Sequence, residues 1–125
     1  MNNKEYVQSC LKTESPITES LKERFSDRNI RLIHGAFGLQ TESAELTDQL
    51  KKHIFYGKPL DVVNLKEETQ DILWYISIIM DELDFTYEEA METNIKKLKA
   101  RYPEKFTEDK AINRNLEVER KILEA

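Results

Sequence analysis

Apolar residues follow helical spacing along two long segments of this chain. The first runs from about residue 29 to residue 55, and the second from about residue 61 to residue 83, including the apolar run ILWYISIIM at 72–80. Between them, residues 56–59 (YGKP) contain a glycine and a proline, which commonly end helices. The pattern predicts two long helices that are joined by a short loop and pack antiparallel.

Further helices are expected on the C-terminal side of these two. Thr86 is followed three residues later by Glu89, a capping-box pattern that marks a helix start. Pro103 is expected to end that helix, because proline cannot continue it. The charged tail from Lys110 to Ala125 is expected to form one more helix.

The N-terminal pattern is weaker and predicts two short helices. One is expected around residues 6–11, and Pro16 is expected to open the other, since proline is favoured in a first turn. With only three glycines and three prolines, an all-β fold is disfavoured. We therefore predict one all-α domain over residues 1–125, an antiparallel helix bundle of four to five helices, with a core at about 29–106 and a helical tail at 107–125.

Two glycines interrupt the first long helix. Gly35 and Gly38 each cost about 1 kcal/mol relative to alanine inside a helix. Such positions usually allow a close approach, either by a neighbouring helix or by a ligand. We favour close helix packing.

Composition and charge narrow the function classes. Hydrophobic residues make up 39% and charged residues 34%, as in a globular protein with well-solvated helices. The net charge of −5 and the lack of a long basic run argue against nucleic acid as a partner. Cys10 is the only cysteine, and the N-terminus lacks the apolar core of a signal peptide. We expect a cytoplasmic protein with no membrane contact.

Two acidic pairs provide the candidate chemistry. Glu42 and Glu45 lie on the first long helix, and Glu68 and Asp71 lie on the second. Residues three positions apart are about 60° apart around a helix, so each pair shares one face. Antiparallel packing lets both pairs converge on one cleft, where four carboxylates need a counter-charge. An all-oxygen set favours Mg²⁺, with Mn²⁺ as a possible substitute, over Zn²⁺.

The spacing of these acids is weak support when taken alone. The chain has 24 acidic residues in 125, which gives about four or five such pairs by chance. A solvated charged face is therefore the alternative interpretation. The context favours a site, because Glu68 and Asp71 adjoin the most apolar segment and the other pair follows HGAFGLQ at 34–40. Acids beside buried surface need a partner.

Cationic and aromatic residues supply candidates for substrate binding. Asn94, Lys97 and Arg101 form one polar stripe suited to phosphate oxygens, although a lysine-rich helix end that complements its own dipole is the alternative. His34 lies on the same side of its helix as the first acidic pair, and Trp74 lies three residues past Asp71. A surface histidine and a core tryptophan are the alternatives. Weaker candidates are Phe37, Gln40 and Tyr102.

Three segments of the sequence resemble a known family. HGAFGLQTESAEL, EETQDILWYI and NIKKLKARYPEKF are similar to the MazG-like branch of the all-α nucleoside triphosphate pyrophosphohydrolases, which are related to dimeric dUTPases and dCTP pyrophosphatases. The resemblance covers about residues 30–106. Glycine is common in the family where this chain has Ala44 and Gln70, and neither position is a metal ligand.

The resemblance implies Mg²⁺-dependent hydrolysis of a (deoxy)nucleoside triphosphate to the monophosphate and pyrophosphate. Glu45 is the preferred general base, and a homodimer or homotetramer is expected. Other base specificities such as dUTP or dCTP, a non-catalytic nucleotide sensor and a helical protein-interaction module remain alternatives. The metal-binding and catalytic residues implied are Glu42, Glu45, Glu68 and Asp71, and those for substrate are Asn94, Lys97, Arg101, His34, Trp74 and Tyr102.

Overall fold

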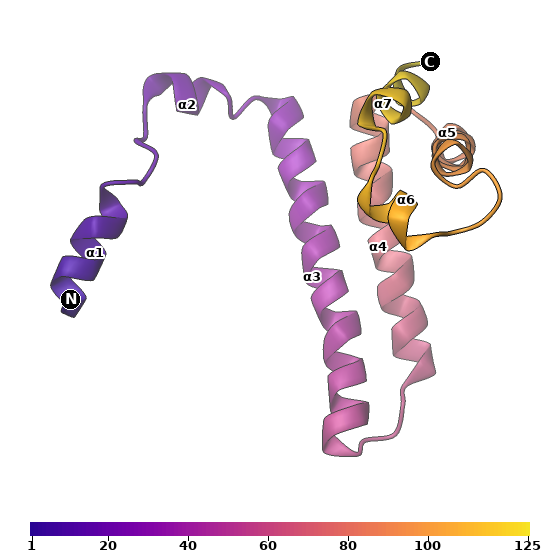
Figure 1. Ribbon diagram of the computed structural model, residues 1–125. Coiled ribbons are helices and arrows are strands. Elements are labelled where there is room, and N and C mark those ends of the chain that lie inside the picture. The colour runs from indigo at the N-terminus through magenta and orange to yellow at the C-terminus, as the bar shows by residue number, and fades with distance from the viewer.

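The computed structural model describes residues 1–125, and every regular element in it is a helix, which confirms the all-α prediction. Figure 1 shows a long helical hairpin with an N-terminal arm on one side and the C-terminal helices on the other. The seven helices are α1 (Asn3–Leu11), α2 (Glu19–Glu23), α3 (Asp27–Tyr56), α4 (Val62–Leu83), α5 (Tyr87–Arg101), α6 (Glu108–Ile112) and α7 (Leu116–Glu124).

The hairpin of α3 and α4 is the largest packed unit of the chain (Figure 1). The predicted stop at residues 56–59 is confirmed, since Gly57 ends α3 in the left-handed conformation with φ 66°. Glycine adopts this conformation without steric cost, and Pro59 prevents the helix from continuing. Asp61 then caps α4 by accepting a hydrogen bond from the Asn64 backbone N–H at 3.0 Å.

The glycines of α3 allow α4 to approach closely, as predicted. Gly35 and Gly38 are buried. A β-carbon at Gly38 would lie 2.0 Å from Cε1 of Tyr75, and one at Gly35 would lie 2.6 Å from Cγ1 of Ile79. No side chain fits at such distances, so the two glycines form a seam that holds the Tyr75 ring against the α3 backbone.

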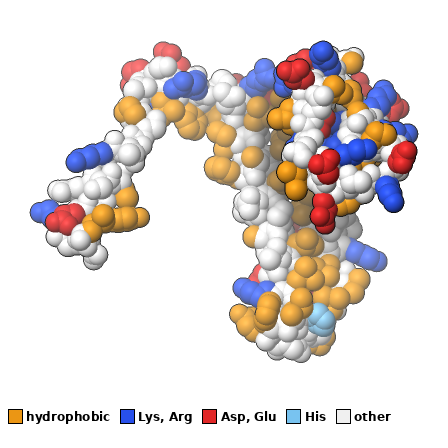
Figure 2. All heavy atoms as spheres, viewed as in Figure 1, with side chains coloured by type: hydrophobic (Ala, Val, Ile, Leu, Met, Phe, Trp, Pro, Cys, Tyr) orange, Lys and Arg blue, Asp and Glu red, His pale blue; other side chains and the backbone are white.

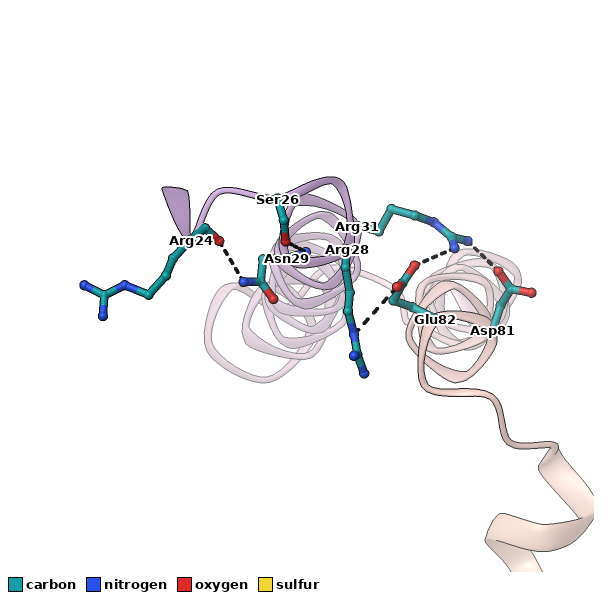
Figure 3. Close-up of polar contacts among 7 residues, drawn as sticks. All are labelled: Arg24, Ser26, Arg28, Asn29, Arg31, Asp81 and Glu82. Atoms are coloured by element: carbon teal, nitrogen blue, oxygen red, sulfur yellow. Dashed lines mark hydrogen bonds and ion pairs between the residues drawn. The ribbon is translucent and has the colours of Figure 1, made fainter. Parts of the chain in front are cut away.

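Ion pairs join the open end of the hairpin (Figure 3). Arg31 of α3 donates to Glu82 at 2.7 Å and to Asp81 at 2.6 Å, and these carboxylates raise the pKa of Arg31. The Nε atom of Arg28 lies 3.8 Å from the same Glu82. Two carboxylates at the negative end of the α4 dipole repel it, and Arg31 offsets that repulsion.

The C-terminal helices form a second unit, in which α7 packs on α5. The buried carboxylate of Glu119 accepts two hydrogen bonds from Arg101, from Nε at 2.8 Å and from an Nη at 2.6 Å. Arg114 donates to it at 2.5 Å. These two guanidinium groups lower the pKa of Glu119 to about 2, so the group stays ionised in the folded protein.

Three details differ from the sequence predictions. The second short helix does not open at Pro16, because Thr18 caps it and its first residue is Glu19. The tail forms two helices, because α6 ends at Ile112 and Asn115 caps α7. The chain has more than the expected four to five helices, and its extensive contacts fall into two pairs, α3 with α4 and α5 with α7.

Little of the apolar surface is buried within one chain. Met80 is the only large apolar residue that is buried. The accessible surface is 10511 Å² for a mass of 14.8 kDa. A compact monomer of this mass exposes about 7,000 Å². No helix combines the length and the apolar composition needed to cross a membrane.

Alanine at position 38 tests the glycine seam. We expect Gly38→Ala to lower the free energy of unfolding by about 1 kcal/mol, because the overpacking against Tyr75 exceeds the gain in helix propensity. In a Tyr75→Ala background the same change should stabilise by up to about 1 kcal/mol. Urea denaturation at one protein concentration measures both values. Equal effects in the two backgrounds would contradict the close approach.

Loss of the negative charge of Glu119 tests the attachment of α7. The pKa of Glu119 is below that of an unfolded glutamate, so its contribution is present above about pH 4.5 and is lost as the pH falls towards 2. We expect Glu119→Gln to release α7 already at pH 7, detected as faster tryptic cleavage after Arg120 and Lys121. Glu117→Gln, on an exposed residue of the same helix, is the matched control. Equal cleavage of both variants would show that the ion pairs do not hold α7.

Candidate functional site

Three carboxylates converge in the seam between α3 and α4. Glu42, Glu68 and Asp71 each offer an oxygen, and these oxygens all lie within 4.8 Å of one another. Glu42 follows Gly35 and Gly38 along the face of α3 that packs on α4. The close approach that the glycines allow therefore sets the acids of the two helices opposite each other.

Glu68 is the most enclosed of the three acids. It is buried, and its Oε1 accepts a hydrogen bond from the Asn64 side-chain amide at 2.7 Å. Asn64 lies one turn earlier on α4, so it holds the Glu68 carboxylate in place. Its own buried Oδ1 has no hydrogen-bond partner. Sequence analysis missed Asn64, although its i, i+4 spacing to Glu68 was a usable signal.

The cluster carries uncompensated negative charge. The pKa of Glu42 is raised above its ordinary value by burial and then by the neighbouring charge of Glu45, with Glu68 and Asp71 adding to the shift. A raised pKa means that the ionised form of Glu42 is disfavoured when no cation is present. The site therefore favours either a proton or a bound cation.

Glu45 lies outside the converging group. It is exposed on α3, one turn after Glu42, and its charge acts on Glu42. Of the four predicted metal ligands, the structure brings three together and leaves Glu45 beside them. This position leaves the Glu45 carboxylate accessible to water.

The donor set suits a hard divalent cation. All the converging atoms are carboxylate oxygens, and the side-chain amide of Asn64, which bonds Glu68, has a carbonyl oxygen without a partner. Oxygen ligands of this kind are preferred by Mg²⁺ and Mn²⁺, whereas zinc sites draw on cysteine and histidine. The residues present thus fit the predicted metal.

An aromatic group lies further along the same hairpin. The ring centroids of His34 and Trp74 are 6.5 Å apart, and Tyr75 packs edge-on to both, at 5.7 Å from His34 and 4.9 Å from Trp74. Trp74 is 57% exposed, so it is not a core residue within one chain. The structure therefore joins two of the predicted substrate residues into one exposed aromatic surface.

The remaining predicted substrate residues lie at the C-terminal half of α5 or just beyond it. Asn94 is exposed and Lys97 is half-buried. The Arg101 guanidinium is held by Glu119 and lies 5.7 Å from the centre of the Tyr102 ring. Within one chain, Arg101 thus binds a carboxylate with the two-pronged geometry that would also suit a phosphate.

Comparison with protein families identifies the family of this chain. The model of the MazG nucleotide pyrophosphohydrolase domain matches residues 36–106, more than half of the chain. The chain belongs to this family. Comparison with curated proteins and with solved structures gave no match.

Membership of the MazG family confirms the resemblance seen in the sequence. The matched region contains all three converging carboxylates, Asn64 and Trp74. It ends at Phe106, so α1 and α2 at one end and α6 and α7 at the other lie outside it. The match thus covers most of α3 and all of α4 and α5, and the arm and the tail lie outside it.

The charge of the cluster predicts how pH and cations affect stability. The folded pKa of Glu42 is above the ordinary value of 4.5, so the folded protein holds this proton more tightly than the unfolded chain does. The metal-free protein should therefore lose stability as the pH rises from about 4.5 through the folded pKa. In EDTA at pH 7.5, Glu42→Gln should therefore have a higher Tm than the wild type. Millimolar Mg²⁺ should raise the Tm of the wild type and leave that of Glu42→Gln nearly unchanged.

Glu67→Gln is the matched control for that measurement. Glu67 adjoins Glu68 but is exposed and outside the cluster, so its substitution should preserve the response to Mg²⁺. An equal response to Mg²⁺ in the wild type and in Glu42→Gln would contradict a metal site at this cluster.

Proposed function

We propose that this protein hydrolyses a (deoxy)nucleoside triphosphate to the monophosphate and pyrophosphate. The observation that carries the proposal is the convergence of Glu42, Glu68 and Asp71 within the region that matches the MazG domain. Carboxylates from two different helices, gathered in a seam, are an arrangement for holding a cation against an anionic substrate.

Glu42, Glu68 and Asp71 would hold Mg²⁺, with Mn²⁺ as a substitute. When bound, the cation supplies neutralisation of phosphate charge and lowers the pKa of a bound water. Asn64 keeps Glu68 oriented and offers a further oxygen at its unpartnered carbonyl. Positioning of this kind commonly changes metal affinity by about 10–100-fold when it is removed.

Glu45 is proposed as the general base. A water oxygen attacks the α-phosphorus, the bond to the bridging oxygen breaks, and pyrophosphate leaves while Glu45 takes the proton of the water. Glu45 suits this role because it lies beside the cluster and is exposed to solvent. A base must reach the water without being occupied as a cation ligand.

Asn94, Lys97 and Arg101 are proposed to bind the phosphate chain. Lys97 acts as a point charge and Asn94 as a hydrogen-bond donor. For Arg101 to contribute, a phosphate must replace the Glu119 carboxylate that it now binds. Arg101 therefore contributes only when α7 moves, whereas Lys97 has no ion pair to break.

The exposed aromatic surface is proposed to receive the nucleobase. His34 and Trp74 form part of this surface, with Trp74 three residues past Asp71 on α4, and stacking on aromatic rings tolerates different bases. Tyr102 is a weaker candidate, since it packs against Phe106 with ring centroids 5.4 Å apart.

Self-association is part of the proposal, as a homodimer or homotetramer. The chain exposes roughly 3,500 Å² more than a compact monomer of its mass, and a standard interface buries about 800 Å² of each partner. Exposed apolar residues of the hairpin, including Phe37 at 69% and Trp74, would then be covered by a second copy. Such an arrangement would close the open side of the site.

Pyrophosphate release from a panel of NTPs and dNTPs in Mg²⁺ tests this function. We expect Glu68→Gln to lower kcat/KM by about 100-fold or more, since it removes the central charge of the cluster. It should also abolish the Mg²⁺ binding measured by calorimetry without nucleotide. Glu67→Gln, one residue away on the exposed face, should change neither quantity by more than about 2-fold.

Two results would contradict the proposal. Release of pyrophosphate that is unchanged in Glu68→Gln would remove the cluster from catalysis. Nucleotide binding by the wild type without any turnover in Mg²⁺ or Mn²⁺ would favour a nucleotide sensor, and the absence of both would favour a helical interaction module.

A further inference from the structure

The N-terminal arm, residues 1–25, extends away from the hairpin. It contains α1 and α2, and no residue of it is buried. Figure 1 shows α1 separated from every other helix of the chain. Neither α1 nor α2 makes an extensive contact with another helix. The arm is also outside the region that matches the MazG domain.

The first helix of the arm has an apolar face with nothing to cover it. Tyr6, Val7 and Leu11 lie along one side of α1, and Tyr6 and Leu11 are 61% and 59% exposed. The helix has nine residues. Isolated helices shorter than about 12–15 residues are marginal in water, even with a capping box such as that of Asn2 and Glu5. A stable α1 therefore requires a packing surface from elsewhere.

Hydrogen bonds order the corner between α2 and α3. The Asn29 side chain donates to the Arg24 backbone carbonyl at 2.7 Å, and Ser26 caps α3 by accepting from the Asn29 N–H at 3.3 Å (Figure 3). Pro16 lies in the extended link between α1 and α2 and prevents the two from merging into one helix. The corner at residues 24–29 thus orders the junction of α2 with α3, and the extended link keeps α1 a separate helix.

Arm and hairpin enclose a concave apolar surface. Figure 2 shows hydrophobic side chains on the side of the arm that faces α3 and on the adjoining side of α3. At the corner lies a cavity of about 420 Å³, open to solvent. Its lining is mostly apolar and includes Leu21, Phe25, Leu32, Ile33 and Ala36.

We propose that the arm packs on the hairpin of a second copy of this chain, so that each copy embraces the other. The excess of exposed surface given above is several times what one partner buries in a standard interface, which is enough for an interface that includes the arm. Every copy carries both the arm and the hairpin, so a two-fold arrangement satisfies both arms and closes the assembly. This proposal rests on the self-association proposed above and adds the element that makes the contact.

The single cysteine gives a direct test in the full-length protein. Cys10 is exposed on α1, next to Leu11, and benzophenone maleimide would label it alone. Benzophenone-labelled protein of natural isotope abundance (light) is mixed with ¹⁵N protein that carries no benzophenone (heavy). The mixture is refolded and then irradiated. We expect cross-linked peptides that join light α1 to heavy α3 or α4. Cross-links confined to light peptides, or none, would overturn the proposal.

A matched pair of variants separates the apolar contact from chance proximity. Leu11→Glu places a charge on the apolar face, and Ser9→Glu places the same charge about 160° around α1 from Leu11. We expect Leu11→Glu to lower the yield of light–heavy cross-links at least 5-fold and Ser9→Glu to leave it unchanged. Equal yields from the two variants would overturn the proposal.

Light scattering and pyrophosphate release distinguish this proposal from the proposed function. A dimer of wild-type protein without light–heavy cross-links overturns the role of the arm, and hydrolysis by that dimer would leave the proposed function standing. A monomeric wild type overturns the role of the arm as well. Thermal unfolding of Leu11→Glu checks that the hairpin is retained. The variant should still unfold cooperatively, because α1 makes no extensive contact with α3 or α4.

Discussion

The close approach of α3 and α4 at Gly35 and Gly38 is the constraint on which the site depends. With side chains at these positions the Tyr75 ring could not lie against α3, and the helices would separate by the thickness of a side chain. Glu42 and Glu68 would then move apart, since they lie on the same seam. Two glycines that weaken the helix locally are thus the means by which carboxylates of different helices come within reach of one cation.

Acidic residues have cationic partners at the open end of the hairpin but none in its middle. At the open end, Asp81 and Glu82 are neutralised by Arg31, and the pair holds the helices together. In the middle, no cationic side chain pairs with Glu42 or Glu68. A buried acid without a cationic partner opposes folding, so the presence of Glu68 in a packed seam is explained better by a cation than by stability. This contrast supports a cation site more strongly than the spacing of the acids did.

Local signals in the sequence predicted much of this fold, and contacts between distant residues explain what they missed. The Thr86–Glu89 capping box and the Gly57 stop depend only on neighbouring residues, and both are present as predicted. Three of the four acids converge because helical periodicity and a short loop determine which faces meet. Arg101 was predicted as a phosphate ligand, but its pairing with Glu119 joins residues 18 apart and has no periodic signature. Likewise, the exposure of Trp74 could not be read from its apolar neighbours, because the chain alone does not cover them.

In a single chain the candidate site is open to solvent on one side. Glu68 is buried, while Asp71 and the aromatic surface beside it face solvent. Electrostatic stabilisation of phosphate charge is much stronger where water is excluded, so an open seam is a poor place for such chemistry. Exposed apolar residues of the same hairpin, including Phe37 and Trp74, also lack a cover within one chain. A second copy that buries those residues would also lower the dielectric around the carboxylates, which links the proposed assembly to the proposed reaction.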